Sequence, residues 1–180
     1  VTKIPGFGHC KMPAQPNLPG VDISYPWQIP HSIEYFFQNS RTEQSPWEVS
    51  IEKNGQGFME RSTQPLFARK MFCWGTNVGG RHWCDYLSQQ GKGDYIEIQA
   101  GLAPTQLHTA VLPANGVVCF TQMFGAFSVD TRAQIEAWNT AMPLVEAQVE
   151  AVLKAEDVAF LHQLYAAKAQ LSGGEILHTG

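Results

Sequence analysis

A β-strand is predicted from Gly93 to Ala100, and from Tyr95 onward its side chains alternate between polar and apolar, which gives the strand two unlike faces. The polar face carries an aromatic ring, a carboxylate and an amide, from Tyr95, Glu97 and Gln99. The other face carries the apolar side chains of Ile96, Ile98 and Ala100. A polar face of this kind fits either a solvated outer surface or a surface that binds sugars.

Five further short strands are expected in the first 129 residues. They are Ile33 to Asn39, Trp47 to Lys53, Phe58 to Ser62, Arg69 to Trp74 and Gly116 to Phe127. Asn54-Gly55-Gln56-Gly57 supplies a hairpin turn, and Asn115-Gly116 marks the turn before the last strand. Short strands separated by such turns are typical of an antiparallel β-sandwich.

The first ~45 residues are rich in proline and glycine, which predicts loops rather than regular structure. Their prolines are Pro5, Pro13, Pro16, Pro19, Pro26 and Pro30. So long an irregular opening is unusual in an autonomous domain. We therefore expect loops that lie over a sheet supplied from elsewhere.

The pattern changes at Asp130, after which alanine and glutamate dominate and predict helices. Thr131 to Gln134 has the form of a capping box, and Pro143 is expected to separate two helices. A further helix is expected from about Glu156 to Leu171, ending at Gly173-Gly174. The sequence thus predicts a β-sandwich over residues 1–129 and two or three α-helices over residues 130–180.

Composition excludes several classes of partner. The net charge is −4 without a basic run, so neither nucleic acid nor an acidic membrane surface is an expected partner. No apolar stretch approaches the ~20 residues of a membrane span. The four cysteines lack Cys-x-x-Cys spacing and the histidines lack the spacing of a zinc site, so no metal or cofactor is expected. A reducing, cytoplasmic compartment fits this cysteine usage. The chain begins at Val1 rather than Met, which favours a fragment of a longer protein.

Several motifs resemble a bacterial family of unknown function, whose galactose-mutarotase-like domain precedes tetratricopeptide-like helical repeats. The matching segments are Ser62-Thr63-Gln64-Pro65-Leu66, Lys70 to Gly75, Gly79-Gly80-Arg81-His82-Trp83, Tyr95 to Ala103 and Thr105-Gln106. The order of the last segments, from Glu97-Ile98-Gln99 through Leu112-Pro113 to Phe127, is also similar to the C-terminal part of the mutarotases themselves.

The resemblance implies a mainly β fold, the C-terminal half of a galactose-mutarotase-like sandwich. It implies a sugar or oligosaccharide as ligand, and as further partners the missing upstream half of the domain and a downstream helical repeat. By analogy, Glu97 is the catalytic acid or base of a mutarotase-like epimerase or of a glycoside hydrolase-like enzyme. The chain departs from the mutarotases in one respect, because their upstream arginine and two histidines have no counterpart here.

The remaining candidates for sugar binding surround this strand: Gln99, Arg81, Trp74, Trp83, Tyr95, Gln106, His82 and His108. Aromatic rings stack on pyranose faces, yet tryptophans are also common core residues. Arg81 either holds a ligand through its planar fork or pairs structurally with Glu97. Gly79-Gly80 is interpreted as a turn. An alternative function is a non-catalytic β-sandwich binding or scaffold module attached to a helical-repeat protein-interaction region.

Overall fold

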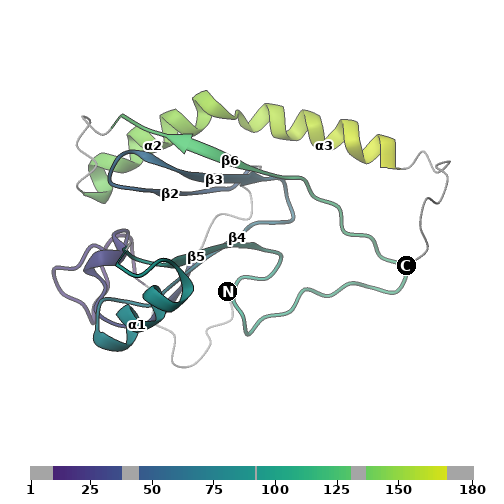
Figure 1. The fold of residues 1–180 in the computed structure, drawn as a ribbon. Coiled ribbons are helices and arrows are strands. Elements are labelled where there is room, and N and C mark those ends of the chain that lie inside the picture. The colour runs from purple at the N-terminus through teal and green to yellow at the C-terminus, as the bar shows by residue number, and fades with distance from the viewer. Residues whose placement is uncertain (1–9, 38–44, 92, 131–136, 170–180) are drawn as a thin grey trace.

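The computed structural model describes residues 10–37, 45–91, 93–130 and 137–169 (Figure 1). The strands are β1 (Ile33–Phe37), β2 (Trp47–Ile51), β3 (Gln56–Ser62), β4 (Ala68–Cys73), β5 (Ile96–Gly101) and β6 (Gln122–Ser128). The helices are a short 3-10 turn η1 (Pro26–Gln28), α1 (Val78–Leu87), α2 (Trp138–Val152) and α3 (Ala155–Ala169).

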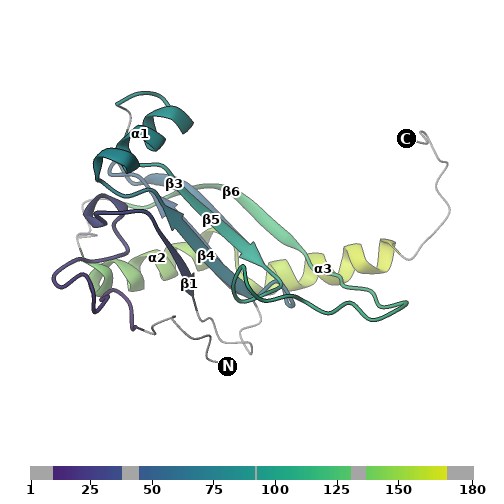
Figure 2. The same ribbon diagram turned by 90° about the horizontal axis from the view of Figure 1, so that it is seen from below.

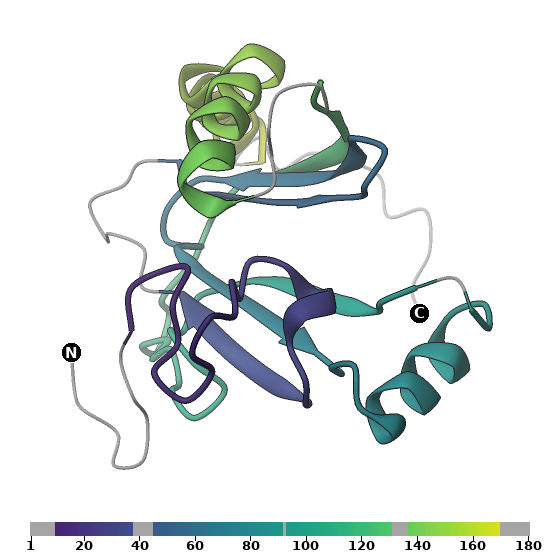
Figure 3. The ribbon, with the colours of Figure 1, turned by 90° about the vertical axis from the view of Figure 1, so that its left-hand side faces the viewer.

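The strands form two antiparallel three-stranded sheets, β1–β4–β5 and β2–β3–β6. The two sheets lie one over the other, and α2 covers the far side of the β2–β3–β6 sheet (Figures 1 and 3). The chain passes from the end of β3 in one sheet to the start of β4 in the other through the short connection 63–67. This crossing brings the middle strands of the two sheets close together at one end.

All six strands predicted from the sequence are present, and the hairpin between β2 and β3 turns at Gly55, which has a φ of 82°. The last strand starts at Gln122 rather than Gly116, because residues 102–121 form a long excursion without strand pairing. The described helices contain about as many residues as the strands. The chain is therefore a mixed structure of antiparallel sheets and helices, rather than the mainly β structure expected.

One detail of the helix prediction is wrong. Pro143 lies inside α2 instead of separating two helices. Its ring costs one hydrogen bond to the preceding turn, and the burial of Val145 and Val149 offsets this loss. The break falls instead at Leu153, between α2 and α3. The expected capping box at 131–134 and the expected Gly173-Gly174 terminus lie outside the described residues.

The irregular N-terminal segment covers a sheet that this same chain builds, and not one supplied from elsewhere. Ile23 and Ile29 are buried against Tyr35, Met71 and Cys73 of the β1–β4–β5 sheet. Such a cluster explains why a segment rich in proline is ordered without strand pairing, since its apolar side chains are anchored in the core.

A second core joins α2 to the β2–β3–β6 sheet. Val145 and Val149 pack against Met59 and Phe127. Arg61 adds a polar anchor: it donates to the Leu153 carbonyl oxygen at 2.6 Å and pairs with Glu150 at 2.5 Å. The guanidinium thereby meets the negative end of the helix dipole. No helix among the described residues has the length and apolar content needed to cross a bilayer.

A buried arginine connects the two sheets. The Arg69 side chain on β4 is 2% exposed and forms an ion pair with Glu60 of β3 at 2.7 Å. It donates to the carbonyl oxygens of Pro46 at 2.7 Å and Leu66 at 2.9 Å, and to Ser62 Oγ at 2.8 Å. One guanidinium thus binds strands from both sheets and the segment that enters β2.

A second glutamate lies beside this pair. Glu48 of β2 is the cross-strand partner of Glu60, so the two side chains share one face of the sheet. Burial raises the pKa of Glu48 to about 7, Arg69 opposes that shift, and Glu60 adds to it. Burial also raises the pKa of Glu60, against the effect of Arg69. Two carboxyl groups therefore compete for one arginine.

Replacing Arg69 by methionine should destabilise the chain by about 3–5 kcal/mol, because it leaves buried carboxyl groups without their cation. Urea denaturation followed by circular dichroism measures this loss. Lys154→Met is the matched control, since the Lys154–Glu156 pair is 60% and 76% exposed and should contribute little. Equal stability of the two variants would contradict the role assigned to Arg69.

Glu48→Gln should remove a pH dependence of stability. The pKa of Glu48 in the folded chain, about 7, lies above its ordinary value of 4.5, so its contribution is complete below pH 4.5 and is lost as the pH rises through 7. Over that pH range, the urea midpoint of the variant should therefore rise relative to the midpoint of the wild type. Glu52→Gln on the same hairpin, an exposed position, should follow the wild type throughout.

Candidate functional site

The polar face predicted for β5 is the outer face of the β1–β4–β5 sheet. On β4, Arg69 points to the other sheet, so the alternate residues Lys70 and Phe72 lie on the opposite face. Register places Glu97 beside Phe72 and Gln99 beside Lys70. Figure 2 shows this sheet from its open side, with α1 at one end.

β1 completes this face with residues that the sequence analysis did not single out. Glu34 lies beside Phe72, so a row of three side chains runs Glu34, Phe72 and Glu97 across the sheet. Glu34 is exposed and Glu97 is half-buried. Alternation within β1 was the available signal for Glu34, but the sequence does not reveal that β1 and β5 flank the same strand.

Gln106 folds back from the excursion after β5 onto this face. Its Nε2 donates to Gln99 Oε1 at 3.0 Å, and its Oε1 accepts from Lys70 Nζ at 3.3 Å. Gln99 and Gln106, both predicted as binding residues, are thus brought together. Lys70 is a further member that the sequence analysis missed, because nothing in the sequence of β4 indicated its partners.

Helix α1 supplies the aromatic part of the site, and its presence corrects the interpretation of Gly79-Gly80 as a turn. Both glycines lie in its first turn, which Asn77 caps by accepting a hydrogen bond from the Gly80 amide at 2.7 Å. A Cβ at Gly80 would lie 2.3 Å from the carbonyl oxygens of Trp74 and Gly75. Glycine is required here because the helix packs directly on the end of β4.

Four aromatic rings form a continuous series from β4 to α1. Phe72 contacts Trp74 edge-on at 4.8 Å between ring centroids, Trp74 stacks on Trp83 at 5.0 Å, and Trp83 contacts Tyr86 at 5.8 Å. Trp83 and Tyr86 are 43% and 75% exposed. His82 also contacts Trp83, at 6.2 Å between rings. Because Phe72 also lies between the two glutamates, the aromatic series and the polar row share one residue.

Arg81 pairs with Asp94 and not with Glu97. The hydrogen bond to Asp94 raises the pKa of the Arg81 guanidinium, with burial opposing. Arg81 also donates to the Gly75 carbonyl oxygen at 3.2 Å. These contacts fasten α1 to the segments before and after it, so Arg81 positions the helix.

The two other predicted residues lie beyond the ends of β5. Tyr95 precedes the strand, and its amide donates to Cys84 Sγ at 3.4 Å. His108 lies in the excursion after the strand, where its Nδ1 is 2.8 Å from Thr105 Oγ1. The structure thus gathers Glu97, Gln99 and Gln106 with Trp74, Trp83 and His82, and gives Arg81, Tyr95 and His108 other contacts.

No group of three or more metal-ligating side chains occurs in the described part of the chain. No family profile, curated protein or solved structure matches this chain.

Trp74 and Trp83 are stacked with an interplanar angle of 19°, so their indoles should give an exciton couplet in the far-ultraviolet circular dichroism. Trp83→Leu should abolish the couplet. Trp27→Leu is a matched control, because Trp27 is also 43% exposed but contacts Tyr25 instead of a second indole. A couplet that survives in the first variant would rule out the stacked pair.

Proposed function

We propose that the outer face of the β1–β4–β5 sheet binds a carbohydrate. The observation that carries this proposal is the row of Glu34, Phe72 and Glu97, from which the aromatic series leads to the exposed ring of Trp83. Pyranose rings have flat apolar faces and a rim of hydroxyl groups, so they favour surfaces where aromatic rings and polar groups adjoin.

The amide pair extends the polar part of this surface. Gln99 and Gln106 each offer a donor and an acceptor, and Lys70 adds a cation. A sugar hydroxyl both donates and accepts, so carboxylates, amides and an ammonium group on one face suit it. Their hydrogen bonds to one another also hold the amide groups in place before a ligand arrives.

As a catalytic form of this proposal, Glu97 acts as the general acid or base. Glu34 is the second carboxyl group, two strand spacings away, which corresponds to about 9–10 Å between Cα atoms. Inverting glycosidases hold their carboxyl groups about 6.5–9.5 Å apart. Phe72 lies between the two glutamates, so the reaction proposed is hydrolysis with inversion, whose wider carboxyl spacing leaves room for a water molecule. The accompanying fold proposal is the C-terminal half of a mutarotase-like sandwich, which the two facing antiparallel sheets support.

A second candidate is a binding or scaffold module without chemistry. The openness of the face favours it, since Trp83 and Tyr86 are exposed on a surface and enzymes usually enclose their substrates. Its helical part would then contact a downstream repeat through Phe160 and Tyr165 of α3, which are 63% and 58% exposed. Both candidates belong in the cytoplasm, which the four free cysteines support.

A glycan array followed by calorimetry on the best-bound saccharide tests the proposal. Trp83→Ala should weaken binding at least tenfold, as expected for the loss of a stacking platform. Trp27→Ala, equally exposed but outside the site, should bind like the wild type. Absence of binding to every glycan would overturn the proposal.

Turnover of the bound saccharide distinguishes the two candidates. Glu97→Gln should abolish hydrolysis and leave affinity nearly unchanged, because the amide keeps the shape but cannot exchange a proton. Glu52→Gln, an exposed glutamate in the β2–β3 turn, is the control. Binding without turnover by the wild type would favour the non-catalytic module.

A further inference from the structure

Strand β6 is an edge strand without any charged residue. It pairs with β3 on one side, and no described element pairs with its other side. Its residues are Gln122, Met123, Phe124, Gly125, Ala126, Phe127 and Ser128. Edge strands are ordinarily protected from pairing with other chains by charge, proline or a bulge.

The other edge strands of the two sheets each carry a glutamate: Glu34 in β1, Glu48 in β2 and Glu97 in β5. If any of these strands paired with its own copy in a register centred near its glutamate, two like charges would be brought close together. Pairing of β6 with its own copy would bring no charged side chains together. Among the described edge strands, β6 is therefore the one where charge repulsion does not oppose pairing with a second copy of the same chain.

The backbone of β6 offers its free hydrogen-bonding groups at alternate positions. The Thr121 carbonyl oxygen accepts from Thr63 and the Val129 amide donates to Gly55, so odd-numbered residues bond toward β3. The amides and carbonyls of the even-numbered residues therefore point to the open edge. These residues are Gln122, Phe124, Ala126 and Ser128.

We propose that β6 pairs antiparallel with β6 of a second copy, with Gly125 on the two-fold axis. This register places Phe124 beside the partner's Ala126 and Gln122 beside the partner's Ser128. Every such pair joins even-numbered residues, whose backbone groups face the open edge, and a bulky side chain meets a small one. A two-fold interface requires this kind of self-complementarity.

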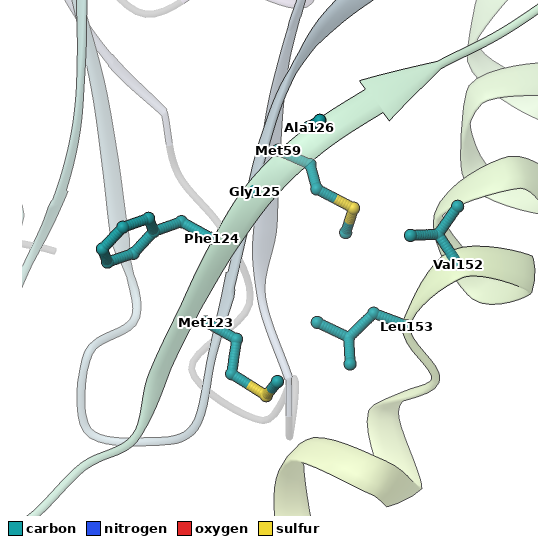
Figure 4. Close-up of a pocket in the computed structure, with 7 residues that line it drawn as sticks. All are labelled: Met59, Met123, Phe124, Gly125, Ala126, Val152 and Leu153. Carbon is teal, nitrogen blue, oxygen red and sulfur yellow. The ribbon is translucent and has the colours of Figure 1, made fainter.

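An apolar groove beside β6 receives the partner. The groove has a volume of about 200 Å³ and is lined by Met59, Met123, Phe124, Gly125, Ala126, Val152 and Leu153. Figure 4 shows Met59, Met123, Val152 and Leu153 gathered on the side of β6 that faces α2, with Phe124 turned away. A Cβ built on Gly125 meets no atom within 4 Å. In the proposed register the partner's Met123 lies diagonally across from Gly125, where a flexible thioether can fill this space.

Light scattering after size-exclusion chromatography should give the full chain twice its monomer mass of 20.0 kDa. Phe124→Lys should return it to monomer, because the new ammonium group lies diagonally across from its own copy at the axis. Phe58→Lys is the control: Phe58 contacts Phe124 on the same face, but it lies on the central strand. A wild-type monomer, or a dimer lost only in the control, would overturn the proposal.

Disulfide trapping tests the register. In a background with the exposed Cys10 and Cys119 changed to serine, Gly125→Cys should cross-link two chains on oxidation, because facing residues lie about 4.5 Å apart in a non-hydrogen-bonded pair. Ser128→Cys should not, because its two copies would be about 20 Å apart. The reverse pattern, or cross-linking of neither variant, would exclude pairing centred on Gly125.

Discussion

The ion pair between Arg69 and Glu60 is the contact on which the arrangement of the two sheets depends. Each sheet has only three strands, and so small a sheet depends for its stability on packing an apolar face against another element. Arg69 lies where β3 crosses over to β4, and it binds Glu60, Ser62 and the Pro46 carbonyl oxygen of the other sheet. A buried arginine with several fixed acceptors permits few alternative alignments, because any shift leaves a buried polar group unpaired. One apolar cluster then packs the N-terminal segment onto the inner face of the β1–β4–β5 sheet, and the other packs α2 onto the far face of the β2–β3–β6 sheet.

The same strand also builds the candidate site. Alternation along β4 places Arg69 and Met71 on the face toward the other sheet, and Lys70 and Phe72 on the outer face. β1 and β5 flank β4, so Glu34 and Glu97 take positions on either side of Phe72. Any ligand held on the outer face would thus lie on a strand whose inner face is fixed by buried contacts. A rigid support of this kind is what a preorganised binding surface requires.

Local patterns were sufficient to predict the strands and the C-terminal helices, because alternation and helix propensity act within a few residues of sequence. They failed where contacts between distant segments decide the structure. Gly79-Gly80 indicated a turn, yet Gly80 lies in α1 because that helix packs against the Trp74 carbonyl. Pro143 indicated a break, yet burial of the following residues keeps α2 intact. Glu97 and Gln99 could be selected from alternation, whereas Glu34 and Lys70 required knowledge of strand order.

The central claim is that the outer face of the β1–β4–β5 sheet binds a carbohydrate. Nitrogen-15 NMR tests it most directly, when the best-binding saccharide from an array is titrated into the chain. The indole N–H signals of Trp74 and Trp83 and the amides of β4 and β5 report on the outer face. Their chemical shifts should change and then level off as the site fills, while the chemical shifts of the β6 amides stay constant. Shifts confined to β6 or the helices α2 and α3, or no shift with any saccharide, would contradict a carbohydrate site on this sheet.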